Sequence, residues 1–320
     1  MRYVTNSFTV ALLVVTTIFV SCNREQKVLK FAYQPFSSNL PIFVAFENGY
    51  FEEFGLNVEP VKIISANDAA NAVVNNEVVA NATVPLNVLL NIEEKQPGLM
   101  KVFMVKATSN DVWSDYILVK KGSEIDSLSD LAGKKIGSYP GSNNRMLMQL
   151  ILDEFIENKD YTTVEMPPST QLSGLDAGNV DAILTYDELA MTGLENNIAQ
   201  VLAEKPLSTY VINPYNGFPY VVSTKFFKEN PEEAKKLIQA MFKAVDFINS
   251  NDIEARQILQ KWTNCDEQIA KKVNLWNQVK LNDIDKEALQ KLADLFYENG
   301  ITEKKIDTKS LYVPSELFNN

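Results

Sequence analysis

The chain of 320 residues contains no histidine. Histidine is the commonest general base and the commonest ligand of transition metals, so its absence argues against an enzyme and against a zinc or copper site. Cysteine is almost as scarce, with two residues, Cys22 and Cys265. Because Cys22 lies in the N-terminal segment described below, a disulfide framework and a cysteine-based metal site are excluded. No spaced Asp/Asn/Gly loop of the calcium-binding kind is present either, and we expect neither a metal nor a cofactor.

An excess of basic residues is also missing. Lys+Arg 30 against Asp+Glu 41 gives a formal net charge of −11. Nucleic-acid binding depends on the attraction of basic side chains to phosphates, and no basic stripe runs along this chain, so we expect no nucleic-acid partner. A small anionic ligand remains compatible with the composition, because one local pocket can oppose the overall charge.

Long apolar runs are confined to the N-terminus. The uncharged, mostly apolar segment Phe8–Val20 is too short for an ordinary membrane span and ends at Ser21-Cys22. This looks like the acylation site of a bacterial lipoprotein; plain secretion with an incidental cysteine is the alternative. We therefore predict a lipoprotein signal peptide over residues 1–22, lipidation of Cys22 and a tether over residues 23–27. The protein would then be extracytoplasmic, in the cell envelope, and anchored to a bacterial membrane by its lipid.

The length and the repeated pattern of the chain indicate two lobes. The remaining roughly 300 residues exceed the usual size of a single core, and 46% of the chain is apolar. Strand and helix patterns alternate as parallel βαβ sheets require. One strand–helix–strand–helix–strand unit occurs twice. The copies run from Val28 to Val84 and from Lys134 to Thr185. We predict an α/β fold of two lobes with related topology, each a mainly parallel sheet flanked by helices.

The chain is predicted to pass twice between these lobes. The candidate crossings are two short extended segments, Ile117–Lys120 and Tyr220–Thr224. Lobe one then comprises residues 28–119 and 224–320, and lobe two comprises residues 120–223. The pattern after the second crossing is nearly all helical, with apolar residues at helical spacing. We expect these C-terminal helices to extend lobe one.

The most distinctive stretch is LPIFVAFENGYFEEFGLNVEPV, residues Leu40–Val61. It combines a helix with apolar spacing, a glycine stop and an alternating strand. Three further motifs follow in order: DLAGKKIGSYPGS (Asp130–Ser142), GLDAGNVDAI (Gly174–Ile183) and KENPEEAKKL (Lys228–Leu237). Together they resemble the periplasmic solute-binding proteins of ABC importers for sulfonates, nitrate and the pyrimidine precursor of thiamine. The resemblance implies a type II periplasmic-binding-protein fold and delivery of a bound solute to an importer permease.

The candidate binding residues follow from this architecture. In open α/β sheets, ligands bind beyond the carboxyl ends of the strands, and two facing lobes place two sets of such ends across one cleft. From lobe one these residues are Gln34, Phe36, Ser37, Ser38, Asn39, Pro85, Asn87, Ser109 and Trp113. From lobe two and the second crossing they are Gly141, Ser142, Asn143, Asn144, Tyr186, Asp187, Glu188, Tyr215 and Asn216.

Two parts of this set favour different ligand groups. The turn at Gly141 opens a helix whose unpaired N–H groups would bind a carboxylate, sulfonate or phosphate, unless Ser142 or Asn143 merely caps the helix. Asp187 and Glu188 instead favour an amine or another hydrogen-bond donor, and the aromatic residues offer stacking faces for a flat heterocycle. We expect a small polar organic solute, either a heterocycle like the thiamine pyrimidine precursor or a sulfonate-like anion.

Three functions are compatible with these observations. The leading hypothesis is a membrane-tethered, monomeric receptor that closes on its solute by a hinge motion and is then recognised by a permease. A lipoprotein that senses a ligand without transporting it is the second. The third is an extracytoplasmic enzyme, which we do not expect: acyl transfer would lack a histidine base, and Asp187 and Glu188 on an extended segment would point to opposite faces.

Overall fold

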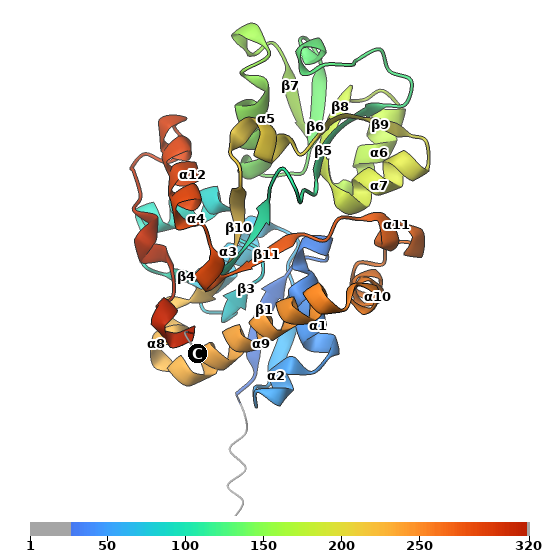
Figure 1. Cartoon of the computed structure of the whole chain (residues 1–320). Coiled ribbons are helices and arrows are strands. Elements are labelled where there is room, and N and C mark those ends of the chain that lie inside the picture. The colour runs from blue at the N-terminus through green and yellow to red at the C-terminus, as the bar shows by residue number, and fades with distance from the viewer. Residues whose placement is uncertain (1–26, 319–320) are drawn as a thin grey trace, which may run out of the picture.

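The computed structural model describes residues 27–318 and divides them into two sheets with helices around them (Figure 1). The six-stranded sheet has the order β11-β4-β10-β3-β1-β2. Its strands are β1 Leu29–Tyr33, β2 Val58–Lys62, β3 Ala80–Asn81, β4 Met100–Thr108, β10 Tyr215–Ser223 and β11 Asn277–Lys280. The five-stranded sheet has the order β7-β6-β8-β5-β9. Its strands are β5 Asp115–Lys120, β6 Lys135–Ser138, β7 Thr162–Glu165, β8 Ala182–Tyr186 and β9 Ala199–Glu204.

Helices flank both sheets, and lobe two lies above lobe one in Figure 1. Lobe one carries α1 Leu40–Glu47, α2 Tyr50–Glu53, α3 Ala66–Val74, α4 Leu86–Lys95, α8 Thr224–Glu229, α9 Pro231–Ser250, α10 Asp252–Thr263 and α12 Lys286–Glu298. Lobe two carries α5 Ser142–Leu152, α6 Pro168–Asp176 and α7 Asp187–Glu195. The predicted two-lobed α/β architecture is confirmed. Within residues 27–318, no helix has the length and apolar character needed to cross a membrane.

The duplicated unit predicted from the sequence is present in both sheets. β1 pairs in parallel with β2 and β3, and β6 pairs in parallel with β7 and β8. An antiparallel strand then follows in each sheet, β10 beside β3 and β5 beside β8. The two lobes therefore share one topology, and each places the carboxyl ends of its parallel strands at the same edge.

The two crossings lie earlier in the chain than the sequence predicted. The predicted segments belong to β5 and to the end of β10, which are interior strands. The chain instead passes between the sheets through residues 109–114 and 205–214. The physical reason is burial: every side chain from Tyr116 to Val119 is buried, as an interior strand covered on both faces requires. The lobe boundaries predicted at 119/120 and 223/224 move accordingly.

The apolar core extends through both lobes. The larger cluster of buried side chains includes Phe31 and Phe103 of lobe one and Leu147 of α5 in lobe two. A smaller cluster lies within lobe two around Leu118 and Leu175. The apolar stripe of α9 packs against α1 and α2, so the C-terminal helices extend lobe one as predicted.

One C-terminal segment departs from that prediction. The nearly all-helical pattern predicted after the second crossing is interrupted here: α11 (Glu267–Lys272) is short, and the chain then forms the edge strand β11 beside β4. We call residues 264–276 the strap, because they run from lobe one onto lobe two and back. Lys272 Nζ lies 2.6 Å from Glu195 Oε1 of α7, and Asn274 Nδ2 donates to the Tyr116 hydroxyl at 3.1 Å. The strap therefore adds non-covalent contacts between the lobes to the two chain crossings.

Candidate functional site

The loop after β1 touches lobe two directly. The ring of Phe36 stacks on the ring of Tyr139, with centroids 6.1 Å apart and planes at 26°. The backbone N–H of Ser37 donates to Glu188 Oε1 at the start of α7. The carboxyl ends of β1 and β8 are thereby held face to face, which is the arrangement that the strand-end rule requires.

Tyr186, the last residue of β8, is the centre of an aromatic cluster at this junction. Its ring centroid lies 5.5 Å from that of Tyr139, 6.2 Å from Phe218 and 6.0 Å from Trp276. Its hydroxyl donates to Asn144 Oδ1 at 3.1 Å. The cluster joins lobe two, lobe one and the strap, and burial raises the pKa of Tyr186 well above its ordinary value. Tyr139, Phe218 and Trp276 were not among the predicted site residues.

The two adjacent acids begin a helix and are not on an extended segment, contrary to the prediction. Asp187 and Glu188 occupy the first turn of α7, where carboxylates are favoured by the helix dipole. Asp187 is fully buried, and neither of its carboxylate oxygens has a hydrogen-bonding partner among the described residues. Burial, with a contribution from the neighbouring Glu188, raises the pKa of Asp187 well above its ordinary value. Burial also raises the pKa of Glu188.

A third buried carboxylate lies where the first crossing ends. Asp115 begins β5 and accepts a hydrogen bond from the backbone N–H of Leu207 at 2.8 Å. Burial raises the pKa of Asp115 to about 6, and the Leu207 N–H opposes this rise. No lysine or arginine among residues 27–318 forms an ion pair with any of these three acids.

Lobe one contains a buried lysine that the sequence reasoning missed. Lys106 of β4 is fully buried, and its ammonium donates to Asn39 Oδ1 and to the Ala82 carbonyl at 2.7 Å each, and to Thr83 Oγ1. Its Nζ also lies 4.5 Å from the ring centroid of Tyr220. Burial lowers the pKa of Lys106 well below its ordinary value. A lysine inside the apolar strand FMVKA was the available sequence signal, since lysine is almost never fully buried without a partner.

Several predicted residues carry buried polar atoms that have no partner. Gln34 Nε2, Asn87 Oδ1, Asn143 Oδ1 and the Tyr215 hydroxyl are all of this kind within the described part of the chain. The four residues are between 0% and 6% exposed. Buried polar groups are rarely left unpaired, so these atoms are candidates to bind a polar ligand.

The helix turn after β6 does not use its side chains as caps. The residue before α5 is Gly141, with φ 117° and ψ 155°, a conformation that L side chains rarely adopt. A Cβ at this position would meet nothing within 4 Å. Ser142 is exposed, whereas Asn143 is buried. The capping alternative is therefore not what the geometry shows, although the helix end remains open to an acceptor.

Other predicted residues have local structural partners. Pro85 precedes α4, and the Ser38 carbonyl accepts from the Tyr220 hydroxyl and from Gln278 Nε2, at 3.1 Å each. Asn39 binds Lys106 rather than facing lobe two. The hydrogen bonds of Ser38 and Asn39 named here are all to residues of lobe one.

The remaining predicted residues lie outside the junction. Ser109 Oγ accepts from two backbone N–H groups of its own loop, at 3.2 and 3.1 Å. Trp113 packs against the smaller core of lobe two, with Lys205 Nζ 5.1 Å from its ring centroid. Arg145, whose direction was left open, is exposed and pairs with Glu165 at 2.9 Å. Ser109 and Trp113 therefore belong to the crossing.

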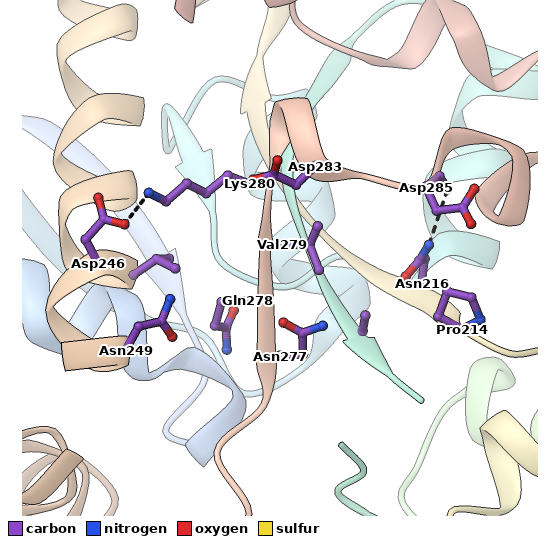
Figure 2. A pocket seen from close by; sticks show the side chains of 12 residues that line it. Pro214, Asn216, Asp246, Asn249, Asn277, Gln278, Val279, Lys280, Asp283 and Asp285 are labelled. Atoms are coloured by element: carbon purple, nitrogen blue, oxygen red, sulfur yellow. Dashed lines mark hydrogen bonds and ion pairs between the residues drawn. The ribbon is translucent and has the colours of Figure 1, made fainter. Parts of the chain in front are cut away.

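Asn216 lines a different hollow, shown in Figure 2. Its Nδ2 donates to the Asp285 carbonyl at 3.3 Å. This groove of about 450 Å³ lies around β11 and α9, with Lys280 paired to Asp246 on one side. Asn216 is the only predicted site residue that lines it, so the groove is separate from the junction around Tyr186.

Within residues 27–318, no group of three or more acidic or cysteine side chains is placed to hold a metal ion. Cys22, the predicted lipidation site, lies outside the described residues.

Comparison with known proteins places this geometry in a family. A family model described as NMT1/THI5 like matches residues 37–255. A putative aliphatic sulfonates-binding protein of Bacillus subtilis (strain 168) is 25% identical over 302 residues, which cover 90% of this chain and 86% of that protein. The 4-amino-5-hydroxymethyl-2-methylpyrimidine phosphate synthase THI13 of Saccharomyces cerevisiae (strain ATCC 204508 / S288c) is 22% identical over 233 residues, covering 70% of this chain and 67% of that protein.

A solved structure shows the same fold. The periplasmic aliphatic sulphonate binding protein SsuA from Escherichia coli matches with a TM-score of 0.73 at 18% identity, and the match covers 90% of this chain and 92% of that chain. The predicted periplasmic-binding-protein fold is therefore confirmed.

Proposed function

Because the chain belongs to the NMT1/THI5-like family, we propose that it is the solute-binding component of an ABC-type importer and holds a small polar organic solute between its lobes. The observation that carries this proposal is the pair of contacts across the junction, Phe36 on Tyr139 and Ser37 on Glu188. Gln34 precedes Phe36 in the same loop and Asp187 precedes Glu188; Gln34 Nε2 and both carboxylate oxygens of Asp187 are buried and have no hydrogen-bonding partner within residues 27–318. The binding proteins among its relatives support the same role.

The chemistry of the junction favours a ring solute with an amino group over a sulfonate. Lobe two contributes the acceptors Glu188 and Asp187, which would attract a donor and repel an anion. Arg145 is exposed and paired, and Lys106 is enclosed by lobe one. No lysine or arginine among residues 27–318 forms an ion pair with Glu188 or Asp187 that would offset the repulsion. The facing rings of Phe36 and Tyr139 suit a flat solute. The relative named as a pyrimidine phosphate synthase is consistent with this class of solute.

Capture would proceed by hinge closure. Layers of carbon atoms in contact are separated by about 3.5 Å, so a ring held between two others needs their centroids about 7 Å apart. The Phe36 and Tyr139 centroids are 6.1 Å apart, and a small opening at residues 109–114 and 205–214 would admit the solute. A solute that touches both lobes stabilises the closed form, which is the form that a permease would recognise. We propose delivery to a permease rather than sensing, and binding without chemistry.

The proposed location follows from Cys22. A lipid on this residue would hold the protein at a bacterial membrane, outside the cytoplasm. The tether of residues 23–27 spans at most about 17 Å when fully extended, at about 3.4 Å per residue. The protein would therefore stay close to a membrane-embedded importer.

A thermal-shift panel tests the proposed solute class. 4-Aminopyrimidine, taurine and nitrate are compared on the wild type and on Glu188→Gln, which keeps an acceptor for the Ser37 N–H but removes the charge. 4-Aminopyrimidine at 100 times its Kd should stabilise the wild type by about 2.7 kcal/mol, and the variant should bind it roughly tenfold to a hundredfold more weakly. Glu157→Gln, at an exposed turn of lobe two, is the matched control and should bind like the wild type.

The other outcomes separate the two parts of the proposal. Stabilisation by taurine or nitrate alone would show that the chain is a solute receptor but that the amino-heterocycle assignment is wrong. Unchanged binding of 4-aminopyrimidine by Glu188→Gln would remove Glu188 from the site.

A further inference from the structure

We propose that Lys106 is a positioning residue: through Asn39 it orients the side-chain amide of Gln34 so that the Gln34 N–H groups face the solute. The site then selects a solute that has an acceptor atom at that point. This inference rests on the proposed function. Its premise is the network of Lys106, Asn39, Thr83 and Gln34, in which Lys106 Nζ donates to three oxygen atoms, one of them Oδ1 of Asn39.

The first step is the orientation of the Asn39 amide. Its Oδ1 receives the Lys106 ammonium at 2.7 Å and the Thr83 hydroxyl at 2.8 Å. Thr83 Oγ1 also accepts from Lys106, so the hydroxyl hydrogen is free to point at Asn39. Two donors converge on one atom of the amide, and that atom must be the oxygen. Lys106 thereby fixes which way the Asn39 side chain faces.

The second step passes this orientation to Gln34. Asn39 Nδ2 donates to the Gln34 carbonyl at 2.7 Å and lies 3.4 Å from Gln34 Oε1. A donor beside the Gln34 side chain holds its oxygen inward and turns Nε2 away. Gln34 Nε2 is buried and has no partner in the part of the chain that the structure describes, on a residue that is 2% exposed.

The third step is the place of Gln34 in the junction. Phe36 and Ser37, which follow it in the same loop, contact Tyr139 and Glu188 of lobe two. A solute held there has a donor wall on the side of Gln34 and an acceptor wall on the side of Glu188. The solute therefore needs an acceptor atom and a donor group on opposite sides, as an aminopyrimidine has and an aniline lacks.

The role of Lys106 is indirect, so the effect of removing it can be distinguished from a general loss of structure. Its ammonium is enclosed by Asn39, Ala82 and Thr83 and by the Tyr220 ring, so it does not touch the solute. Removing it should weaken recognition of an acceptor atom while leaving contacts to an amino group and a ring unchanged. A merely structural residue would weaken every solute alike.

The experiment is calorimetric binding of two matched probes, 4-aminopyrimidine and aniline, to four proteins: the wild type, Lys106→Met, Asn39→Asp and Lys101→Met. Lys106→Met should bind 4-aminopyrimidine about tenfold more weakly, the loss of one hydrogen bond, and bind aniline as the wild type does. Asn39→Asp should give the same selective loss, because it keeps a partner for Lys106 but removes the N–H donor to Gln34. Lys101→Met, on the same strand and partly exposed, should change neither affinity. Equal losses for both probes, or no loss, would overturn the proposal.

A second measurement does not depend on any solute. In ¹⁵N-labelled wild type, the Gln34 side-chain amide should give one pair of resonances with proton contacts to the Asn39 amide. In Lys106→Met this single orientation should be lost, through broadening or a second pair. Unchanged Gln34 signals would overturn the inference about Lys106. Wild type that binds neither probe, with the Gln34 signals altered as expected, would overturn only the proposed solute class.

Discussion

Replacing Asp115 by asparagine should remove a pH dependence of stability that originates at the junction of the lobes. Asp115 is fully buried at the start of β5, accepts from the Leu207 N–H at 2.8 Å and has no salt-bridge partner among the described residues. Its second oxygen, Oδ1, has no hydrogen-bonding partner there either. Asparagine has nearly the same shape and can accept from Leu207, but it does not titrate.

The sign and size of the effect follow from the two pKa values. Asp115 titrates near 3.8 in the unfolded chain and at about 6 in the folded protein, because burial disfavours the charged form. Between these values the folded protein keeps a proton that the unfolded chain has lost, so stability is highest below the lower value and falls as the pH rises through the upper one. At 1.36 kcal/mol per pH unit, the total loss is about 3 kcal/mol.

The assay is urea unfolding of the wild type and Asp115→Asn from about pH 4 to about pH 7, with the free energy of unfolding compared at each pH. The advantage of the variant over the wild type should grow by about 2 kcal/mol across this range, because part of the total loss has already occurred by pH 4. Asp187 lies nearby and also titrates, so the same pair of proteins is measured on an Asp187→Asn background, where the difference should persist. A difference that stays level, or that shrinks as the pH rises, would show that burial does not raise the pKa of Asp115 in the folded protein.

Three other predictions concern separate parts of the molecule. Arg145→Gln should leave the affinity for 4-aminopyrimidine unchanged and stability within about 1 kcal/mol, because its ion pair with Glu165 is exposed; a large loss in calorimetry would place Arg145 in the site. Gly217→Ala should destabilise by roughly 1–3 kcal/mol in urea unfolding, because its Cβ would lie 2.2 Å from the Tyr215 ring; equal stability would mean that this ring moves aside freely. Cys22→Ala in the full-length chain should move the protein from the membrane fraction to the soluble fraction of a bacterial host, and a variant still found with membranes would exclude anchoring through Cys22.

The fold was predictable where the chain alternates short periodic segments with clear stops. The helix expected within Leu40–Val61 is α1, Leu40–Glu47, and the second copy of the unit, expected to begin at Lys134, begins with the strand β6, Lys135–Ser138. The crossings were not predictable by the same reasoning, because a strand buried on both faces, such as β5, has no period of two to mark it. Its identity depends on pairing with β8 and β9, which are distant in the sequence.

The start of α7 is a different kind of error, because a signal was present. Asp187 and Glu188 are followed by apolar residues at helical spacing, and acids in a first turn are typical of a helix N-terminus. The prediction that they lie on an extended segment is therefore wrong. The consequence concerns geometry: on a helix, neighbouring residues point about 100° apart, and here Glu188 contacts Ser37 of lobe one while Asp187 is fully buried.

The candidate site was partly accessible from the strand-end rule. Phe36, Ser37, Tyr186 and Glu188 directly follow or end strands of the duplicated unit, and the structure brings them together. Trp276 was beyond reach, because it arrives from the strap, which is positioned by the pairing of β11 with β4. Contacts set by a distant edge strand leave no local pattern in the sequence.

The contacts of the strap bear on the proposed closure of the two lobes. Trp276 packs against Tyr186 of lobe two and, with a centroid distance of 5.6 Å, against Phe218 of lobe one, and it is 7% exposed. The exposed pair of Lys272 and Glu195 contributes little to holding the lobes together, whereas burial of a tryptophan side chain contributes substantially. Any rotation at residues 109–114 and 205–214 must therefore separate Trp276 from one of its two neighbours. In the proposed closure, the balance between the open and closed forms would therefore depend on the aromatic cluster around Tyr186 as well as on the solute. A solute that stacks on this cluster would change both the packing of the cluster and its own contacts with the two lobes.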